Sequence, residues 1–317
     1  MLRLKNSNSQ ELALKHYAGI QFYLNQVLDF YINFFKLINN EIHSNNAIDI
    51  LYNKSNLDDK TITKLGQSLG FGVSKKYKIK KNNISEVLNN PKAHLNKILY
   101  NYKSENIKLF KDLKDNLEDI IVSKPKELII IESNFKNKYP FIVNNNGIFE
   151  EPIRNILLLN IFNYNKFSNK TGFPINMHKD IFWERYNLCQ ALNISTCAYC
   201  NRIFTVTVVN EKGKGVISPS IDHFFDKASH PFLALSFYNL IPSCTNCNSA
   251  LKGITKFTLD KYIHPYLSGF AENGIFSYKA LDTESALGES ANLEIFIDIV
   301  KDSPLEIQIS NNTSNTR

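Results

Sequence analysis

Several features that would place this chain in other classes of protein are missing or scarce. No apolar run approaches the roughly 18 residues that a membrane-spanning helix needs, and the longest candidates, 128–131 and 156–159, are only strand-sized. Residues 1–15 are polar and mixed in charge, a pattern typical of neither a secretory nor a transit signal. Five cysteines without an export signal disfavour a disulfide framework. We therefore expect a cytoplasmic protein with no membrane contact.

Positive charge is mild overall but unevenly distributed. The 317 residues are 43% hydrophobic and 21% charged, an ordinary globular composition with a formal net charge of +7, and the length suggests roughly two domains. Only five of the 37 basic residues are Arg, and the bias towards Lys, Asn and Ile is typical of an AT-rich genome, so Lys abundance alone indicates little. The local run at 75–81 (Lys-Lys-Tyr-Lys-Ile-Lys-Lys) is either an electrostatic footprint for nucleic acid or a solvated loop.

Hydrophobic periodicity predicts a mostly helical N-terminal half. Apolar residues recur at close to 3.6-residue spacing from 10 to about 43, and further helices are expected at about 84–102 and 105–122. A glycine-punctuated bend at 65–72 lacks the Gly-Lys-Ser/Thr ending of a phosphate-binding P-loop. The first helix has a wide aromatic stripe, which is either core or, in part, an anchor for a partner protein. The candidate anchor residues are Phe30, Tyr31, Phe34 and Phe35.

Shorter segments are expected in the second half of the chain. Asn176 has the character of an N-cap, which predicts a helix from there to about residue 192, and Trp183 and Cys189 on this helix are interpreted as core residues. Later segments are rich in β-branched residues or alternate between apolar and polar positions. These patterns predict strands at 203–209, 216–221, 275–281 and 293–300.

Four of the five cysteines form two closely spaced pairs. The pairs are Cys197-Ala-Tyr-Cys200 and Cys244-Thr-Asn-Cys247, and two such pairs in one chain are rare by chance. Four thiolates in two knuckles can surround one Zn²⁺ ion tetrahedrally, and a closed four-cysteine site leaves no open position for chemistry. The sequence therefore predicts a structural zinc site, and the alternative is a set of buried free thiols.

The two cysteine pairs are separated by more chain than a plain zinc site needs. Forty-three residues lie between Cys200 and Cys244, whereas zinc ribbons have roughly 15–20. This insert carries Asp222-His223 at the end of a predicted strand, and Asn248 follows the second pair directly. Asp222 and Asn248 offer two hard oxygen donors, which together with water molecules suit Mg²⁺ rather than Zn²⁺.

This ordered set of residues resembles the HNH endonucleases, whose ββα-metal motif is often set inside a two-knuckle zinc site. Within that superfamily, residues 236–249 and the downstream His-Pro-Tyr at 264–266 look most like the HNH subunit of Septu-type anti-phage defence systems, including retron-linked ones. The resemblance covers about a third of the chain, residues 176–270. The matching features are the two cysteine pairs, Asp222-His223, Asn239-Leu240, Asn248 and Lys252.

The resemblance implies an α+β fold with two parts. A mostly helical N-terminal domain over residues 1–150, for partner docking or regulation, would precede a zinc-stapled ββα-metal HNH nuclease domain over 151–317, with its core motif at 197–253 and strands at its C-terminal end. The family also implies a companion ATPase subunit. Because this chain has no P-loop of its own, nucleotide control would have to arrive through contact with that partner.

The resemblance further implies a metal-dependent endonuclease that cleaves phosphodiester bonds, with DNA favoured over RNA as the nucleic-acid substrate. His223 would be the general base, Asp222 and Asn248 would hold the catalytic Mg²⁺ or Mn²⁺, and Asn239 would pin the loop that orients His223. The family often has His where this chain has Asn248, a departure that bears on metal preference and rate. Candidate phosphate contacts are Lys252, Arg202 and His230.

Two other functions fit parts of the pattern. A non-catalytic, zinc-stabilised module could use the two knuckles and the run at 75–81 to bind nucleic acid or protein without cutting. Such a module needs neither the Asp222-His223 pair nor Asn248 after the last cysteine, so their joint presence favours the enzyme. A nuclease-fold toxin that cleaves RNA is the third hypothesis, since the motif does not separate RNA from DNA.

Overall fold

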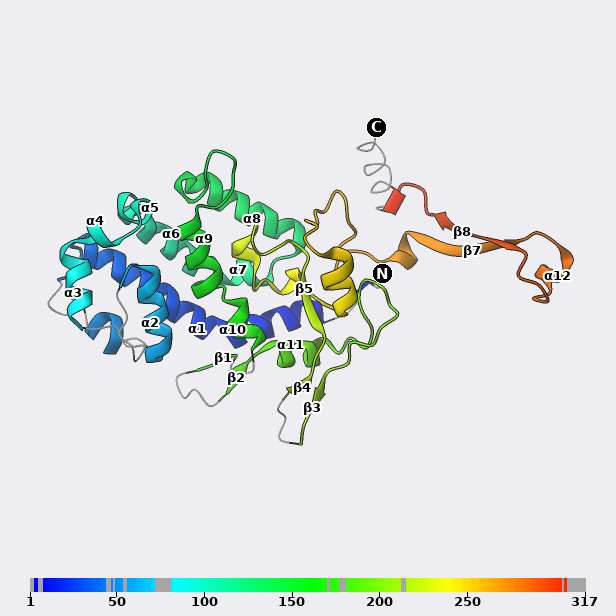
Figure 1. The fold of residues 1–317 in the computed structure, drawn as a ribbon, viewed down its shortest axis with the longest axis horizontal. Helices are drawn as coiled ribbons and strands as arrows, with labels where there is room; N and C mark the ends of the chain where they lie inside the picture. Colours follow the sequence, from blue (N-terminus) through cyan, green and yellow to red (C-terminus); the bar gives the residue numbers. More distant parts are fainter. Residues whose placement is uncertain are drawn as a thin grey trace.

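The fold is α+β, as predicted, with helices dominating the first half of the chain and small antiparallel sheets following (Figure 1). The computed structural model describes residues 3–4, 8–43, 47, 49–53, 56–71, 81–169, 172–176, 181–211, 215–303 and 305–306. The Lys-rich run at 75–81 lies, apart from Lys81, outside these residues. Among the helices described, none has both the length and the apolar character to span a bilayer.

The helix predicted over 10–43 is confirmed as α1 (Ser9–Ile38), which runs through the body and packs against helices and strands from both halves of the chain (Figure 1). Shorter helices surround α1, because Pro and Asn interrupt the longer helices that were expected. Pro91 starts a new helix, since proline does not fit inside one, and the Asn96 side chain caps the following helix by accepting from Ile98 N. These helices are α2 (Asp59–Ser68), α3 (Lys81–Asn89), α4 (Pro91–His94), α5 (Lys97–Asn101), α6 (Lys103–Asp115), α7 (Leu117–Val122), α8 (Pro125–Lys138), α9 (Glu151–Asn155) and α10 (Tyr164–Ser168). Helical turns add η2 (Asp49–Asn53), η3 (Pro140–Ile142) and η4 (Ile156–Ile161).

The aromatic stripe of α1 is core. The four candidate anchor residues are between 0% and 3% exposed, and Tyr31 and Phe35 stack on Phe110 of α6. The hypothesis that these four side chains anchor a partner protein is therefore wrong. They are buried in this chain's own core, where each contributes roughly 1.5–3 kcal/mol to folding. The bend predicted at 65–72 starts later than expected, since Gly66 lies inside α2 and the turn comes at Leu69 and Gly70.

The strands form four separate two-stranded antiparallel sheets. The pairs are β1 (Phe173–Pro174) with β2 (Phe182–Trp183), β3 (Val208–Val209) with β4 (Gly215–Ile217), β5 (Ser220–His223) with β6 (Leu240–Ser243), and β7 (Gly274–Ala280) with β8 (Leu293–Ile299). Between and after them lie α11 (Arg185–Leu192), η5 (Pro231–Leu233), η6 (Phe237–Asn239), η7 (Asn246–Lys252), η8 (Phe270–Glu272) and α12 (Thr283–Ala286).

The helix predicted from 176 to 192 is wrong over 181–184, and 177–180 lie outside the described residues. It begins only at Arg185, because Trp183 pairs with Phe173 in β1–β2 and the Asn187 side chain then caps the helix by accepting from Glu184 N. Trp183 and Cys189 are buried, as expected for core residues. The strand predicted over 203–209 is limited to its last two residues, β3.

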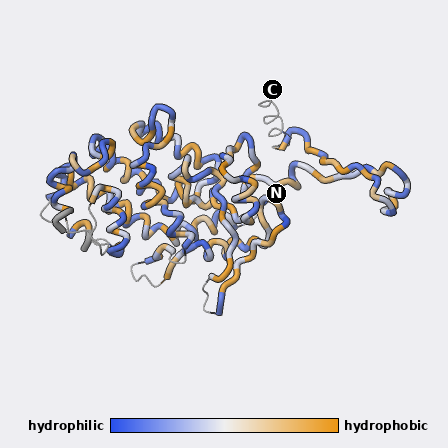
Figure 2. The backbone as a smooth tube through the Cα atoms, viewed as in Figure 1, coloured by the Kyte–Doolittle hydropathy of each residue, from blue (hydrophilic) through white to orange (hydrophobic). Residues whose placement is uncertain are grey.

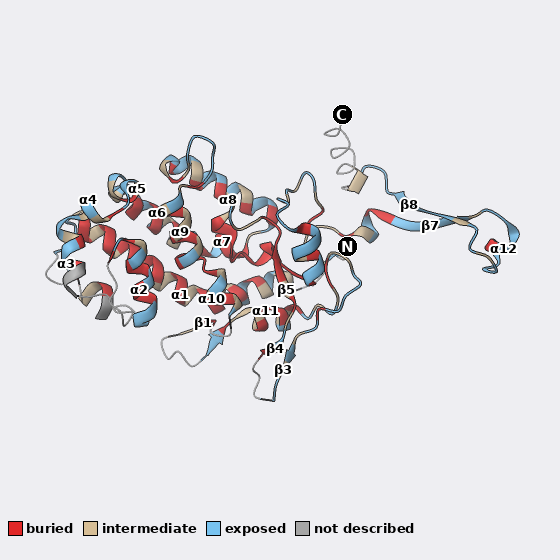
Figure 3. Ribbon diagram, in the orientation of Figure 1, coloured by how far each residue is buried: buried red, intermediate tan, exposed pale blue. Residues whose placement is uncertain are grey.

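One hydrophobic core runs across residue 150. Its buried residues come from α1 and α6 as well as from the segment between β5 and β6, without a gap between the two sets. In the ribbon coloured by burial, buried segments run from the helices to β5 without a break (Figure 3). The division into domains 1–150 and 151–317 stays a prediction.

The hairpin β7–β8 differs from the rest because it projects from the body (Figure 1). Both predicted strands are confirmed, and their register places most of the apolar side chains on one face of the hairpin, with Ile275 and Phe296 on the other. That face is open to solvent: Phe276 is 69% and Ile295 73% exposed. In Figure 2 the hairpin carries both apolar and polar positions. The alternation that predicted the two strands is interrupted at Ile275-Phe276 and at Ile295-Phe296-Ile297.

Candidate active site and metal centre

The four paired cysteines meet in space. Their sulfur atoms all lie within 4.8 Å of one another, and Cys197, Cys244 and Cys247 are buried whereas Cys200 is partly exposed. In the part of the chain that the structure describes, this is the only group of three or more His, Cys, Asp or Glu side chains close enough to share an ion. Four convergent thiolates are the donor set of a closed tetrahedral site, so the cluster can hold a metal ion such as zinc.

Local backbone geometry brings the thiolates together. The first knuckle is closed by a turn in which Asn201 N donates to Cys197 O at 2.9 Å, and Asn201 itself adopts a left-handed φ of 52°, which Asn tolerates better than most residues. Backbone N–H groups of the second knuckle point at sulfur, since Cys244 N lies 3.2 Å from Cys197 Sγ. Such amides stabilise negative charge on the sulfurs, which suits thiolates bound to a cation.

The insert between the knuckles carries the strands β5 and β6, and the helical turn η7 begins within the second knuckle. β5 ends at His223, which pairs with Leu240 at the start of β6, and η7 follows directly after β6. This ββα order brings four predicted site residues to the wall of one pocket of about 620 Å³: Asp222, His223, Asn248 and Lys252.

His223 is held by a backbone carbonyl. Its Nε2 lies 2.9 Å from Ala234 O, and because a carbonyl only accepts, Nε2 carries the proton and Nδ1 keeps its lone pair. The ring is 8% exposed and lies edge-on to Tyr164 at 4.4 Å. Burial, with smaller contributions from nearby Lys227 and Lys252, lowers the pKa of His223 to about 3, so the imidazole is neutral at physiological pH.

Asp222 is buried and already has partners. Lys252 Nζ lies 2.9 Å and 2.7 Å from its two carboxylate oxygens, and Tyr199 OH donates to one of them at 2.5 Å. Lys252 also donates to the backbone carbonyls of His223 and Phe224. Lys252 therefore binds the strand end that carries Asp222 and His223, a structural contact that the sequence analysis did not foresee beside its expected contact with phosphate.

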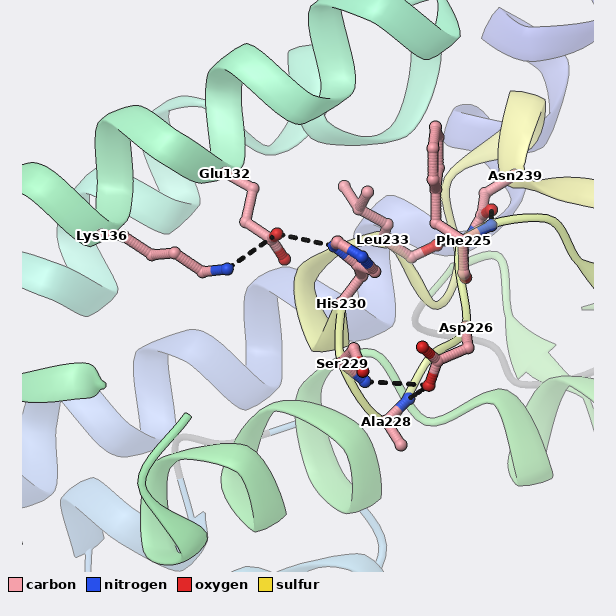
Figure 4. A network of polar contacts seen from close by, with 9 residues as sticks. All are labelled: Glu132, Lys136, Phe225, Asp226, Ala228, Ser229, His230, Leu233 and Asn239. Carbon is pink, nitrogen blue, oxygen red and sulfur yellow. Dashed lines mark hydrogen bonds and ion pairs between the residues drawn. The ribbon is translucent and has the colours of Figure 1, made fainter. Parts of the chain in front are cut away.

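Asn239 clamps the loop between β5 and β6. It is fully buried, its Oδ1 accepts from Phe225 N at 2.7 Å, and its Nδ2 donates to Phe225 O and Leu233 O at 3.1 and 2.9 Å (Figure 4). These three hydrogen bonds connect Phe225 to Leu233, the neighbour of Ala234, whose carbonyl holds the His223 ring. The contacts have the geometry that a loop-pinning role requires, and the role in catalysis stays a prediction.

Two predicted phosphate contacts do not line this pocket. His230 Nδ1 lies 2.8 Å from the Glu132 carboxylate of α8, which also accepts from Lys136 Nζ at 3.1 Å (Figure 4). The His230 ring is thus engaged by the helical half of the chain. Arg202 is exposed beside the first knuckle and is absent from the residues that form the pocket wall.

Other cations at the pocket were missed by sequence reasoning. Arg185, Lys227 and Lys256 line it together with Lys252, against the two carboxylates Asp222 and Asp226. Lys227 also lies over the Tyr164 ring, with its Nζ 4.8 Å from the ring centre. In a Lys-rich chain no local signal separates these residues from surface lysines, although Arg185 is one of only five arginines. The wall therefore combines a neutral imidazole with an excess of positive charge.

Mg²⁺ usually keeps several water ligands and needs only one or two carboxylates from protein. The pocket wall offers two carboxylates, Asp222 and Asp226, and one amide, Asn248. Both Asp222 oxygens accept from Lys252, so a cation at Asp222 has to compete with that ammonium group. In the described part of the chain no group of three or more His, Cys, Asp or Glu side chains converges here, so a catalytic Mg²⁺ or Mn²⁺ stays a prediction.

Comparisons with known proteins add no relative. No protein-family model, no curated protein and no solved structure matches this chain. The structure establishes an α+β chain with a four-cysteine cluster that can hold a metal ion such as zinc. It does not establish the family that the sequence motif resembles.

Proposed function

We propose that this chain is a metal-dependent endonuclease of the HNH type that cleaves phosphodiester bonds of nucleic acid, with DNA preferred to RNA. One observation carries the proposal. A single pocket gathers Asp222 and His223 from β5 and Asn248 from η7, the first and last elements of a ββα unit, and the second cysteine pair lies where β6 leads into η7. Four cations line the same wall, which is the charge that a phosphodiester backbone attracts.

In this proposal the residues of the chain have distinct tasks. Arg185, Lys227 and Lys256 hold the phosphodiester by its charge, and His223 accepts the proton of the attacking water at Nδ1 while Ala234 O holds Nε2. The products are a 5′-phosphate and a 3′-hydroxyl. Asn239 keeps the ring in place through the loop. A Mg²⁺ or Mn²⁺ ion held by Asp222 and Asn248 would neutralise charge on the scissile phosphate and the leaving 3′-oxygen.

The decisive variant is His223→Gln. Its amide can still donate to Ala234 O, so the loop keeps its hydrogen bond while the base is lost. We expect plasmid cleavage in Mg²⁺ or Mn²⁺ to fall about 10²–10⁴-fold, with zinc content and melting temperature unchanged. His94→Gln, on the partly exposed face of α4, is the matched control and should cleave like the wild type.

Three substrate arms separate the alternatives. Plasmid, single-stranded DNA and RNA are incubated with the wild type and with His223→Gln under the same conditions. Cutting of RNA alone would replace the DNA preference with the RNA-cleaving toxin. Binding of any of the three without cutting, in either metal, would favour the non-catalytic module. Equal cutting by both proteins would reject His223 as the base.

We also propose that the nuclease is the effector of an anti-phage defence system with a companion ATPase. Support for this comes from the sequence resemblance at residues 236–249 and 264–266. The expected result is that cells carrying the chain with its ATPase resist phage and that His223→Gln abolishes the resistance. Resistance that survives this substitution would separate the defence role from the nuclease.

A further inference from the structure

Three consecutive carbonyl groups next to the site are each bound by a different side chain. Within the segment 233–236, hereafter the carbonyl segment, Leu233 O accepts from Asn239 Nδ2, Ala234 O from His223 Nε2, and Leu235 O from His16 Nε2, each at 2.9 Å. Asn239 and His223 belong to the ββα unit, but His16 lies on α1, 219 residues away from Leu235 in sequence. The segment that orients His223 is therefore shared with the first helix.

The protonation state of His16 follows from its partners. Trp183 Nε1 can only donate, and it lies 3.0 Å from His16 Nδ1, so Nδ1 must be the acceptor. Leu235 O can only accept, so Nε2 must carry the proton. Both ring nitrogens are thus satisfied by the neutral form with the proton on Nε2. The ring is fully buried, and Phe167 packs edge-on against it at 5.4 Å.

A second helix holds the other end of the carbonyl segment. Ser236 Oγ donates to Ile120 O of α7 at 2.5 Å, and Ser236 is also fully buried. The helical half of the chain therefore grips this segment at two neighbouring residues, Leu235 and Ser236. Ala234, whose carbonyl holds the His223 ring, comes immediately before them. The Leu235 carbonyl and the Ser236 N–H belong to one planar peptide unit, and that N–H donates to Leu233 O at 3.2 Å, which closes a turn around Ala234.

We propose that His16 is a positioning residue for His223. It fixes Leu235 O, which fixes the orientation of Ala234 O, which in turn fixes the ring that takes up the proton. The effect on catalysis rests on the proposed function. The chain of hydrogen bonds from His16 to His223 is a property of the fold and does not depend on it. Small misplacements of a reacting group are costly, with about 1 Å reducing rates by about 10²-fold.

The test compares two substitutions of His16, one that can restore its two hydrogen bonds and one that cannot. His16→Gln can accept from Trp183 Nε1 through its Oε1 and donate to Leu235 O through its Nε2, so both contacts can be rebuilt. His16→Phe fills the ring volume but leaves both partners unpaired. The first readout is the tautomer of His223, read from ¹⁵N chemical shifts of its imidazole at pH 7.5. The second is amide exchange of the peptide that covers residues 224–241.

We expect His16→Gln to match the wild type in both readouts. His16→Phe should give a mixture of His223 tautomers and at least tenfold faster exchange in residues 224–241, with unchanged zinc content. In the cleavage assay kcat should fall about 10- to 100-fold in His16→Phe with little change in KM, and recover in His16→Gln. A purely structural role of His16 would lower stability without moving the His223 tautomer.

A third variant keeps the test decisive if His16→Phe does not fold. Ser236→Ala removes the contact with Ile120 O from the opposite end of the carbonyl segment, and its small side chain leaves the packing almost intact. It should give the same mixture of His223 tautomers. A wild-type tautomer in every folded variant overturns the positioning role, whether or not the protein cleaves nucleic acid. Absence of cleavage by the wild type, with the tautomer shifted as expected, overturns the proposed function and leaves the positioning link intact.

Discussion

Two antiparallel hairpins of this chain have similar backbone pairing and opposite surroundings. β5–β6 has four residues in each strand, nearly all of them buried, and it carries Asp222 and His223. β7–β8 has seven residues in each strand and a longer ladder, yet most of its side chains are exposed. The shorter hairpin sits in the core of the body, and the longer one projects from it (Figures 1 and 3).

The number of paired residues in a hairpin therefore does not determine its stability. An isolated two-stranded hairpin is marginal in water, because its hydrogen bonds replace bonds to water and its side chains lack a surface to pack on. β5–β6 gains from the common core, from the Asp222–Lys252 pair and from the cysteine cluster at its end. β7–β8 gains mainly from cross-strand pairs such as Phe276 with Ile297.

Loss of the metal centre should remove most of the difference in stability between the two hairpins. Cys247→Ala removes one of four thiolates, and structural zinc contributes on the order of 10 kcal/mol in small zinc modules. We expect the variant to be insoluble, or to melt without zinc and with β5–β6 open to proteolysis. Cys189→Ala is the matched control, since Cys189 is equally buried but lies on α11 outside the cluster.

Zinc analysis and melting curves decide this prediction. The wild type and Cys189→Ala should each bind about one zinc per chain, because one four-thiolate site is present among the described residues. A Cys247→Ala protein that melts like Cys189→Ala would show that the thiols are ordinary core residues.

The second prediction sharpens the contrast in packing. Leu240 in β6 is 0% exposed, whereas Ile295 in β8 is 73% exposed. Leu240→Ala should lower the free energy of unfolding by about 2–5 kcal/mol, because it leaves a cavity in a closed core. Ile295→Ala should change it by less than about 0.5 kcal/mol, as usual at the surface.

Urea denaturation of the two variants measures this difference. Similar losses in both proteins would mean that the exposed face of β7–β8 is covered in solution, and a concentration-dependent midpoint would then identify the cover as another copy of the chain.

The third prediction uses acid to distinguish the two hairpins. Burial lowers the pKa of His16 to about 4, with the Leu235 carbonyl opposing the shift, while an unfolded histidine titrates near 6.5. The unfolded state therefore binds a proton first as pH falls, so stability that is complete above pH 6.5 is lost between pH 6.5 and about 4. The loss from His16 is at most about 3 kcal/mol.

His16→Gln removes this titration and should flatten the dependence of stability on pH over that window. The groups that face the His16 ring are the aromatic side chains of Phe167, Trp183 and Phe237 and the Leu235 carbonyl, none of which titrates in this range. Protection against amide exchange at pH 5 should fall in β5–β6 and stay constant in β7–β8, where residues 274–299 contain no histidine. Equal slopes for wild type and variant would contradict the assigned shift.

Local patterns predicted the parts of the molecule that depend on neighbours in sequence. The cysteine pairs, the strands at 275–281 and 293–300, and the first helix each follow from spacing within one segment. The convergence of Asp222, His223 and Asn248 on one pocket also follows from a motif whose parts lie close along the chain.

The features that sequence reasoning missed depend on distant partners. The start of α11 is set by pairing of Trp183 with Phe173, and no periodicity within 176–192 reveals that pairing. His230 was placed near phosphate, but its ring meets Glu132, which is 98 residues away in sequence. His16 has no partner pattern within its own helix, because Trp183 and Leu235, which bind its ring, belong to the other half of the chain.

The shared carbonyl segment also sets an order of events during synthesis. α1 leaves the ribosome early, yet the Leu235 carbonyl that His16 binds is made 219 residues later, which at roughly 5–20 residues per second is about ten to forty seconds. During that interval the aromatic face of α1 lacks the surface contributed by the second half. The contact between His16 and Leu235 cannot form until residue 235 of 317 has been made, so the wall around His223 takes its final arrangement only in the last part of synthesis.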